Sequence, residues 1–114
     1  MLDISVLNGK HLIKVTAASD QVVFVTSEGV YRLYHQQDCC EEVYLYDIDG
    51  DISDMQDTYC CCAYMSQQYN EQSEDYSKTW TFYSIQTAKG YVWLRWIGES
   101  NGYYSESVDF EKLD

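Results

Sequence analysis

The chain has 114 residues, and this length predicts one domain built around one hydrophobic core. Its hydrophobic share of 46% and its aromatic share of 16%, with twelve tyrosines, are too high for a disordered chain. Nineteen acidic residues against seven basic ones give a formal net charge of −12. That charge argues against nucleic acid and anionic membranes as partners, and it favours a basic protein surface.

The sequence predicts a cytoplasmic protein. No segment approaches the roughly 20 apolar residues of a membrane-spanning helix, and residues 1–5 lack the basic and then apolar character of a secretory signal. The five cysteines stand in two adjacent runs, at 39–40 and 60–62. In a reducing compartment they are expected to bind a metal or to be buried, and not to form disulfides.

The first half of the chain predicts strands. Apolar residues alternate with polar ones, Val, Ile, Tyr, Thr and Trp are common, and there is no proline. Residues 11–17 form the first predicted strand. Residues 22–26 and 30–35 form a hairpin closed at 27–29, where Gly29 provides a positive φ.

The middle of the chain is less regular. Residues 43–48 suit either a further strand or an irregular arm, and residues 53–56 suit a short helical turn capped by Ser53. Residues 58–65 suit a strand. Residues 66–77, in which Gln, Asn, Ser, Glu and Asp dominate, predict a flexible surface loop.

The last third predicts a second hairpin, from residues 78–87 and 91–97. Five aromatic side chains are expected to supply apolar area to a sheet face there: Trp80, Phe82, Tyr83, Trp93 and Trp96. Residues 98–102 have turn composition, and a last short strand follows near 107–110. The predicted fold is mainly β, α+β at most: a single compact domain of antiparallel hairpins with a short helical turn.

A metal-binding pattern follows the first predicted hairpin. His35 and Cys39 are four residues apart and Cys40 comes next, so a tight loop can turn an imidazole and a thiolate toward one ion. Thiolates with an imidazole select zinc. The fourth ligand stays open between the cysteines of 60–62 and a carboxylate. The alternative is that His35 caps a sheet edge while the cysteines are buried as small hydrophobic residues.

A catalytic centre is not predicted. The chain has two histidines, no glycine-rich phosphate loop and no nucleophile elbow, so the zinc is expected to be structural and the chain is not expected to be an enzyme. A calcium loop starting at Asp47 also fails, because Ile52 stands where the required glycine belongs and Thr58 where the last acid belongs.

Acidic residues dominate a span without any lysine or arginine, between Arg32 and Lys78. Six of these acids are predicted to bind the partner: Glu41, Glu42, Asp47, Asp49, Asp51 and Asp54. Carboxylates on a rigid surface can imitate a phosphate backbone, and nearby tyrosines supply contact area at low entropic cost. The alternative is a solvated face that only keeps the protein soluble.

Several segments resemble a family of small, uncharacterised phage and prophage proteins. They are residues 31–41, with His-x-x-Asp-Cys-Cys at 35–40, residues 47–48, 50–51 and 79–83, and residues 98–106, with Gly-Glu-Ser-Asn-Gly-Tyr-Tyr-Ser at 98–105. The chain is also similar to a streptococcal type II-A anti-CRISPR zinc metalloprotein in that group. Residues 60–62 depart from the family, which has apolar residues followed by acids there.

The resemblance implies a function. His35, Cys39 and Cys40 would be zinc ligands, with no fourth ligand implied. The chain would be a stoichiometric, phage-encoded inhibitor that binds a type II CRISPR RNA-guided endonuclease in the cytoplasm of the bacterial host and blocks loading of target DNA. The alternatives are a zinc-dependent hydrolase and a structural phage component.

Overall fold

The computed structural model describes residues 2–114, which form eight antiparallel strands in the order β4-β7-β6-β5-β1-β2-β3-β8. The predicted mainly β fold with short helical turns is therefore confirmed. The elements are the 3-10 helix η1 (Ile4–Leu7), β1 (His11–Ala17), β2 (Gln21–Thr26), β3 (Gly29–Tyr34), β4 (Glu42–Asp49), the 3-10 helix η2 (Ile52–Met55), β5 (Thr58–Gln72), β6 (Ser77–Thr87), β7 (Tyr91–Ser100) and β8 (Asp109–Lys112).

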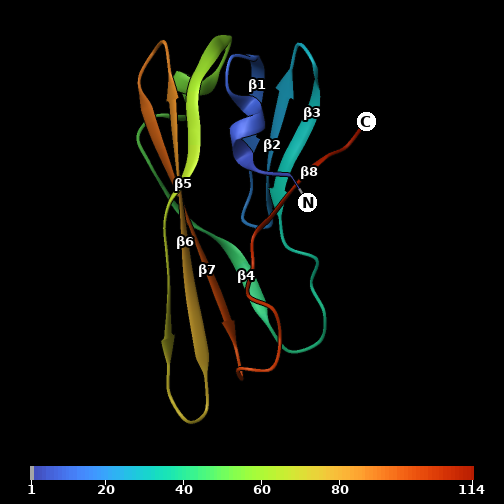
Figure 1. Cartoon of the computed structure of the whole chain (residues 1–114), viewed down its shortest axis with the longest axis vertical. Helices are drawn as coiled ribbons and strands as arrows, with labels where there is room; N and C mark the ends of the chain where they lie inside the picture. Colours follow the sequence, from blue (N-terminus) through green and yellow to red (C-terminus); the bar gives the residue numbers. More distant parts are fainter. Residues whose placement is uncertain (1) are drawn as a thin grey trace.

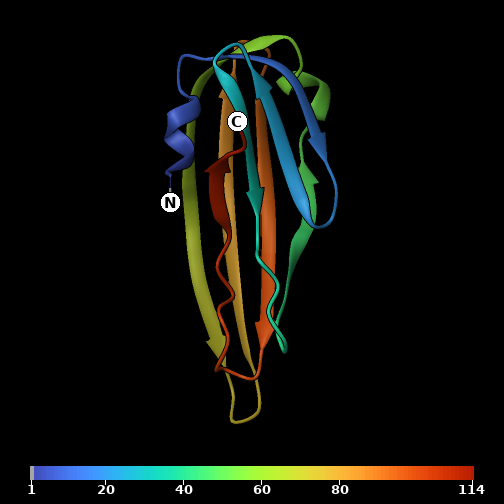
Figure 2. The same cartoon turned by 90° about the vertical axis from the view of Figure 1, so that its right-hand side faces the viewer.

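The sheet folds over on itself. Its two halves join through a short pairing of β1 with β5, where His11 lies opposite Tyr59 and Leu12 opposite Thr58. Figures 1 and 2 show β1, β2, β3 and β8 as one layer and β4, β7, β6 and β5 as the other. A single core cluster includes residues of both layers, such as Phe24 of β2 and Leu94 of β7. The fold is thus a two-layer sandwich.

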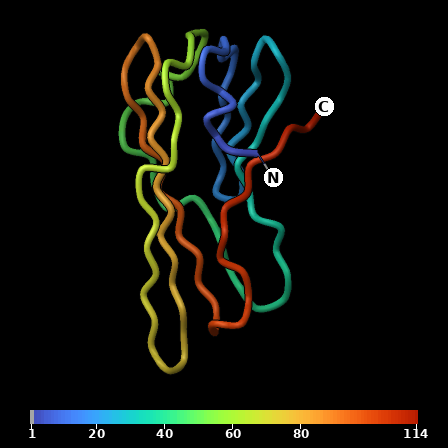
Figure 3. Tube along the Cα trace, in the orientation of Figure 1, coloured from blue at the N-terminus to red at the C-terminus, as the bar shows by residue number. Residues whose placement is uncertain are grey.

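The predicted loop at residues 66–77 is wrong. Strand β5 continues to Gln72 and pairs with β6 along its length, so the turn is confined to residues 73–76. Polar side chains sustain this pairing, because the Asn70 amide donates to the Thr79 hydroxyl across the two strands at 2.9 Å. A bulge interrupts the register beyond Met65, and β5 steps sideways about midway in Figure 3.

The five aromatic residues of the second hairpin do not share one face. Tyr83 and Trp96 are buried in the core. Trp80, Phe82 and Trp93 occupy the alternate positions of β6 and β7 and point away from it. Successive side chains of a strand point to opposite faces, so neighbours such as Phe82 and Tyr83 must separate.

Most other element predictions are confirmed. Residues 11–17 are strand β1, β2 and β3 form the predicted hairpin, and residues 43–48 lie in a strand and not in an irregular arm. The Ser53 cap is wrong, because Asp51 caps η2 and its carboxylate accepts a hydrogen bond from the Ser53 N–H at 2.9 Å. No helix within residues 2–114 is long and apolar enough to cross a membrane.

Candidate functional site

His35 follows β3 and its side chain is only 3% exposed. Its Nε2 lies 2.8 Å from the Glu41 carboxylate, and its Nδ1 lies 2.7 Å from the carbonyl oxygen of Ser107. The carbonyl oxygen of Ser107 can only accept, so Nδ1–H donates to it, and the second ring nitrogen faces the Glu41 carboxylate. His35 thereby ties the loop after β3 to the segment that leads into β8.

Glu41 closes the loop at residues 38–40. Its carboxylate accepts hydrogen bonds from the backbone N–H groups of Asp38 at 2.9 Å and Cys40 at 3.2 Å, in addition to His35. The hydrogen bond from His35 is the largest reason why the pKa of Glu41 lies below its usual value. The Glu41 side chain is only 1% exposed and its carboxylate already accepts these hydrogen bonds, so in this arrangement it is not open to a partner. Partner binding by Glu41 stays a prediction.

Replacing Glu41 with glutamine is expected to make the melting temperature depend less on pH under acidic conditions. Folding lowers the pKa of Glu41 from its usual value of 4.5. The stability that the ionised Glu41 gives to the folded state is therefore fully present above pH 4.5, and it is lost as the pH falls through the lowered pKa. Below pH 4.5 the melting temperature of the wild type should therefore fall more steeply with pH than that of Glu41→Gln. The exposed control Glu42→Gln should behave like the wild type. Parallel curves for all three proteins would contradict this role.

Cys39 and Cys40 are joined by a disulfide. The expectation that the cysteines form no disulfide is wrong for this pair, which sits in the tight loop that Glu41 closes. The Tyr104 hydroxyl lies 3.7 Å from Cys39 Sγ, although the two residues are 65 positions apart. The two most distinctive segments of the resemblance, residues 35–41 and 98–106, therefore lie side by side.

The predicted zinc donors do not fit an ion in this arrangement. The Cys39 and Cys40 sulfurs are bonded to each other, so neither is the thiolate that zinc binds, and both nitrogens of His35 are hydrogen-bonded. Within residues 2–114, no group of three or more His, Cys, Asp or Glu side chains is arranged to hold a metal. Zinc binding by the reduced chain stays a prediction, which metal analysis of protein purified under reducing conditions tests.

The cysteine run in β5 does not supply the missing ligand in this arrangement. Cys60 lies in the core, and burial raises the pKa of its thiol to about 11, so it stays protonated at neutral pH. Cys61 is exposed on the opposite face, as strand alternation predicts. Cys60 therefore acts as a small hydrophobic residue, one of the alternatives that the sequence left open.

Residues 101–106 turn back over β6 and β7, and with residues 98–100 at the end of β7 they form a clasp, residues 98–106. The buried Glu106 carboxyl accepts hydrogen bonds from Ser77 Oγ at 3.2 Å, from Thr79 Oγ1 at 2.7 Å and from the Ser100 hydroxyl. A Cβ on Gly98 would lie 2.7 Å from Glu106 Cβ and 2.8 Å from its carbonyl oxygen, so this crossing requires glycine. Sequence reasoning missed Glu106, although an acid directly after a distinctive motif was a usable signal.

The remaining predicted partner acids separate into two groups. Three lie on the solvent side of β4: Glu42, Asp47 and Asp49. Asp47 forms an ion pair with Arg95 of β7, whereas Glu42 and Asp49 are exposed. Asp51 caps η2, and Asp54 lies within η2 beside Gly90. The first three share one face, and the other two belong to the turn that follows β4.

A family model for a domain of unknown function, DUF7448, matches residues 5–110. The chain belongs to the DUF7448 family. The matched range includes both the loop at 35–41 and the clasp at 98–106. A search of curated proteins and a search of solved structures each found no match.

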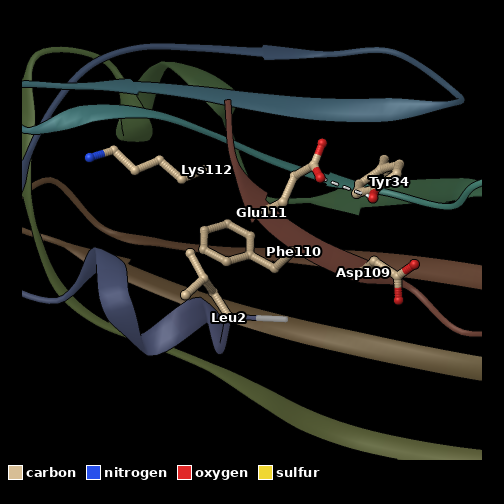
Figure 4. Close-up of a pocket in the computed structure, with 6 residues that line it drawn as sticks. All are labelled: Leu2, Tyr34, Asp109, Phe110, Glu111 and Lys112. Carbon is tan, nitrogen blue, oxygen red and sulfur yellow. Dashed lines mark hydrogen bonds between the residues drawn. The ribbon is translucent and has the colours of Figure 1, made fainter. Parts of the chain in front are cut away.

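One surface hollow of this DUF7448 domain, of about 470 Å³, lies beside β8 (Figure 4). Its walls are Leu2, Tyr34, Asp109, Phe110, Glu111 and Lys112. The Tyr34 hydroxyl donates to Glu111 at 3.1 Å, and Arg32 pairs with the same carboxylate at 2.7 Å. Burial, followed by the contact with Glu111, raises the pKa of Tyr34, so its hydroxyl stays protonated at neutral pH. These polar groups stabilise the pairing of β3 with β8.

Proposed function

We propose that this DUF7448 domain is a stoichiometric inhibitor of a type II CRISPR RNA-guided DNA endonuclease, which it binds directly and prevents from loading target DNA. The observation that carries the proposal is the net charge of −12, with exposed carboxylates displayed on a rigid strand, β4. Endonucleases of this class hold the guide–target heteroduplex in a positively charged channel. An acidic domain bound there blocks DNA sterically and lowers the local positive potential.

Two further observations support an inhibitor over an enzyme. The resemblance to phage proteins rests on the loop at 35–41 and the clasp at 98–106, and both are held by internal hydrogen bonds. The groups that acid–base chemistry would use are engaged in the same way: His35 with Glu41 and Ser107, and Tyr34 with Glu111. Inhibition by occupancy requires no turnover.

The order of addition in a DNA-cleavage assay tests the proposal. When the domain is added to guide-loaded endonuclease before target DNA, cleavage should fall to background at about one domain per enzyme. When it is added after DNA has loaded, cleavage should proceed, so this arm is the internal control. If several type II enzymes cleave DNA in both orders of addition as fully as they do without the domain, the proposal is wrong.

The salt dependence of inhibition tests the electrostatic part separately. Exposed charges are screened over about 8 Å at physiological ionic strength and over about 3 Å at 1 M salt. The concentration needed for half-inhibition should therefore rise steadily with salt. Inhibition that is indifferent to salt would show that acidic residues do not drive binding.

A further inference from the structure

The outer face of the layer β4-β7-β6-β5 carries its side chains in rows. We use "outer face" for the side chains of these four strands that point away from the core. The strand register aligns them across β5, β6, β7 and β4 in that order. The rows are Glu71, Lys78, Glu99 and Glu42; Tyr69, Trp80, Ile97 and Tyr44; Gln67, Phe82, Arg95 and Asp47; then Tyr64, Ser84, Trp93 and Asp49.

Aromatic rings form a platform of two clusters across these rows. Trp80 contacts Tyr46, Tyr69 and Phe82, with ring centroids 5.2, 6.5 and 6.0 Å apart. Tyr91 stacks on Trp93 at 5.7 Å. Large side chains stay open to solvent here, with Tyr46 56% and Trp93 38% exposed. Exposed, clustered Tyr and Trp side chains are typical of binding surfaces, because they are rigid and supply contact area at low entropic cost.

The charges of the outer face are predominantly negative. Its two basic residues are already paired, Lys78 with Glu99 at 3.7 Å and Arg95 with Asp47. Among residues 2–114, Glu42, Asp49 and Glu71 of this face have no salt bridge, and all three are exposed. The free carboxylates are complementary to a cationic partner. They also disfavour a second copy of the chain, since two such faces would repel each other.

A hollow of about 290 Å³ lies within this face. Its walls are Asp49, Ser66, Gln67, Phe82, Trp93 and Arg95. Phe82 and Trp93 provide aromatic surface for an aliphatic stem or a cation, and Asp49 provides an unpaired carboxylate beside them. Arg95 is held by Asp47, which leaves the Asp49 charge for an incoming group. A lysine or arginine side chain matches this combination.

We propose that the outer face is the surface through which the domain binds its partner, with the hollow between Phe82 and Trp93 receiving a lysine or arginine side chain of a basic protein. The identity of that partner rests on the proposed function. The location of the surface rests on the register, the aromatic platform and the unpaired carboxylates. The binding acids are thus Glu42 and Asp49, supported by aromatic residues from three other strands.

The three tryptophans give a direct test of the surface. Trp80 and Trp93 lie on the outer face, whereas Trp96 is fully buried and serves as an internal control. Titration with a short lysine-rich peptide, followed by NMR of the indole N–H groups, should shift the signals of Trp80 and Trp93 and leave Trp96 unchanged. Unchanged Trp80 and Trp93 signals, at peptide concentrations that shift other backbone amides, would overturn the proposal.

Affinity for guide-loaded endonuclease tests the surface and the function separately. Trp93→Ala and Asp49→Lys should each weaken binding by about tenfold or more, because they remove a central anchor or reverse its charge. The controls are Tyr103→Ala, at a side chain 88% exposed outside the outer face, and Asp20→Lys, in the β1–β2 turn. Both controls should bind like the wild type.

The outcomes separate the two proposals. A wild type that binds the endonuclease, together with Trp93→Ala and Asp49→Lys proteins of unchanged affinity and melting temperature, would overturn the surface and leave the function standing. A wild type that does not bind the endonuclease, but whose Trp80 and Trp93 signals respond to the lysine-rich peptide, would overturn the function and leave the surface standing.

Discussion

Replacing Trp96 by alanine is expected to lower the free energy of unfolding by about 3–5 kcal/mol, the range for truncating a large buried aromatic side chain. Trp96 is 0% exposed and lies on the inward side of β7. It sits between Leu45 of β4 and Thr81 of β6 in the strand register. Truncation would leave a cavity where the two layers meet, which the surrounding strands can fill only in part.

Trp96→Phe is the matched control for this prediction. The indole Nε1 of Trp96 is buried and has no hydrogen-bond partner among residues 2–114. Trp96→Phe therefore removes volume without breaking a hydrogen bond. It should lower the free energy of unfolding by less than half as much as Trp96→Ala. Denaturant unfolding, followed by circular dichroism, measures both variants. A Trp96→Ala protein within about 1 kcal/mol of the wild type would show that the layers are not packed around this residue.

Gly98→Ala is expected to cost about 1–3 kcal/mol, the range for adding atoms to a site with no free space. The new Cβ would lie 2.7 Å from Glu106 Cβ and 2.8 Å from the Glu106 carbonyl oxygen. Because one of these atoms belongs to the backbone, side-chain rotation cannot relieve the overlap, and the clasp must move away from β7. That movement would also weaken the hydrogen bonds that Ser77 and Thr79 donate to Glu106.

Hydrogen exchange shows which part of the structure Gly98→Ala destabilises. Exchange should accelerate at residues 98–107 more than in the β2–β3 hairpin, which lies in the other layer. Gln86→Ala is the control, since residue 86 already carries a Cβ on the outer side of β6, and it should change stability by less than about 0.5 kcal/mol. A Gly98→Ala protein as stable as this control would contradict the requirement for glycine.

Alternation of apolar residues was sufficient to predict the short strands. Strand β2 follows this pattern, because Val22 and Phe24 are buried while Gln21 and Val23 are partly exposed. Residues 11–17 form β1 as expected, although a bulge between Leu12 and Lys14 breaks its alternation. The same signal failed beyond Met65. There β5 leaves the core and runs beside β6 in solvent, so its side chains are polar although its backbone is extended. Composition marks burial more reliably than it marks strand geometry.

The loop at 35–41 shows what spacing alone does not predict. The positions of His35, Cys39 and Cys40 indicated three ligands around one ion, and this arrangement instead contains a disulfide and a buried pair of His35 with Glu41. The contact that completes the loop comes from Ser107, 72 positions away in the chain. A hydrogen bond at that separation depends on the tertiary fold and leaves no local pattern in the sequence.

The acidic span was only partly informative about the surface. Glu42, Asp47 and Asp49 share the outer face because a bulge between Leu45 and Asp47 shifts the alternation of β4, while Val43 and Ile48 face inward. Glu41, next to them in the sequence, turns inward to close its loop. Apart from Tyr44 and Tyr46 of β4, the aromatic partners of these acids come from β5, β6 and β7, and the cross-strand register brings these residues to the acids.

Binding of the domain to guide-loaded endonuclease, with and without bound target DNA, is the most direct test of the account. Analytical ultracentrifugation of the mixtures should show a complex of one domain per guide-loaded enzyme. It should show no complex, or a much weaker one, when the enzyme has already loaded its target, because we propose that the domain and the DNA compete for the same positively charged region. Equal binding to the two forms of the enzyme, or to neither, would contradict the claim that the domain acts by blocking DNA loading.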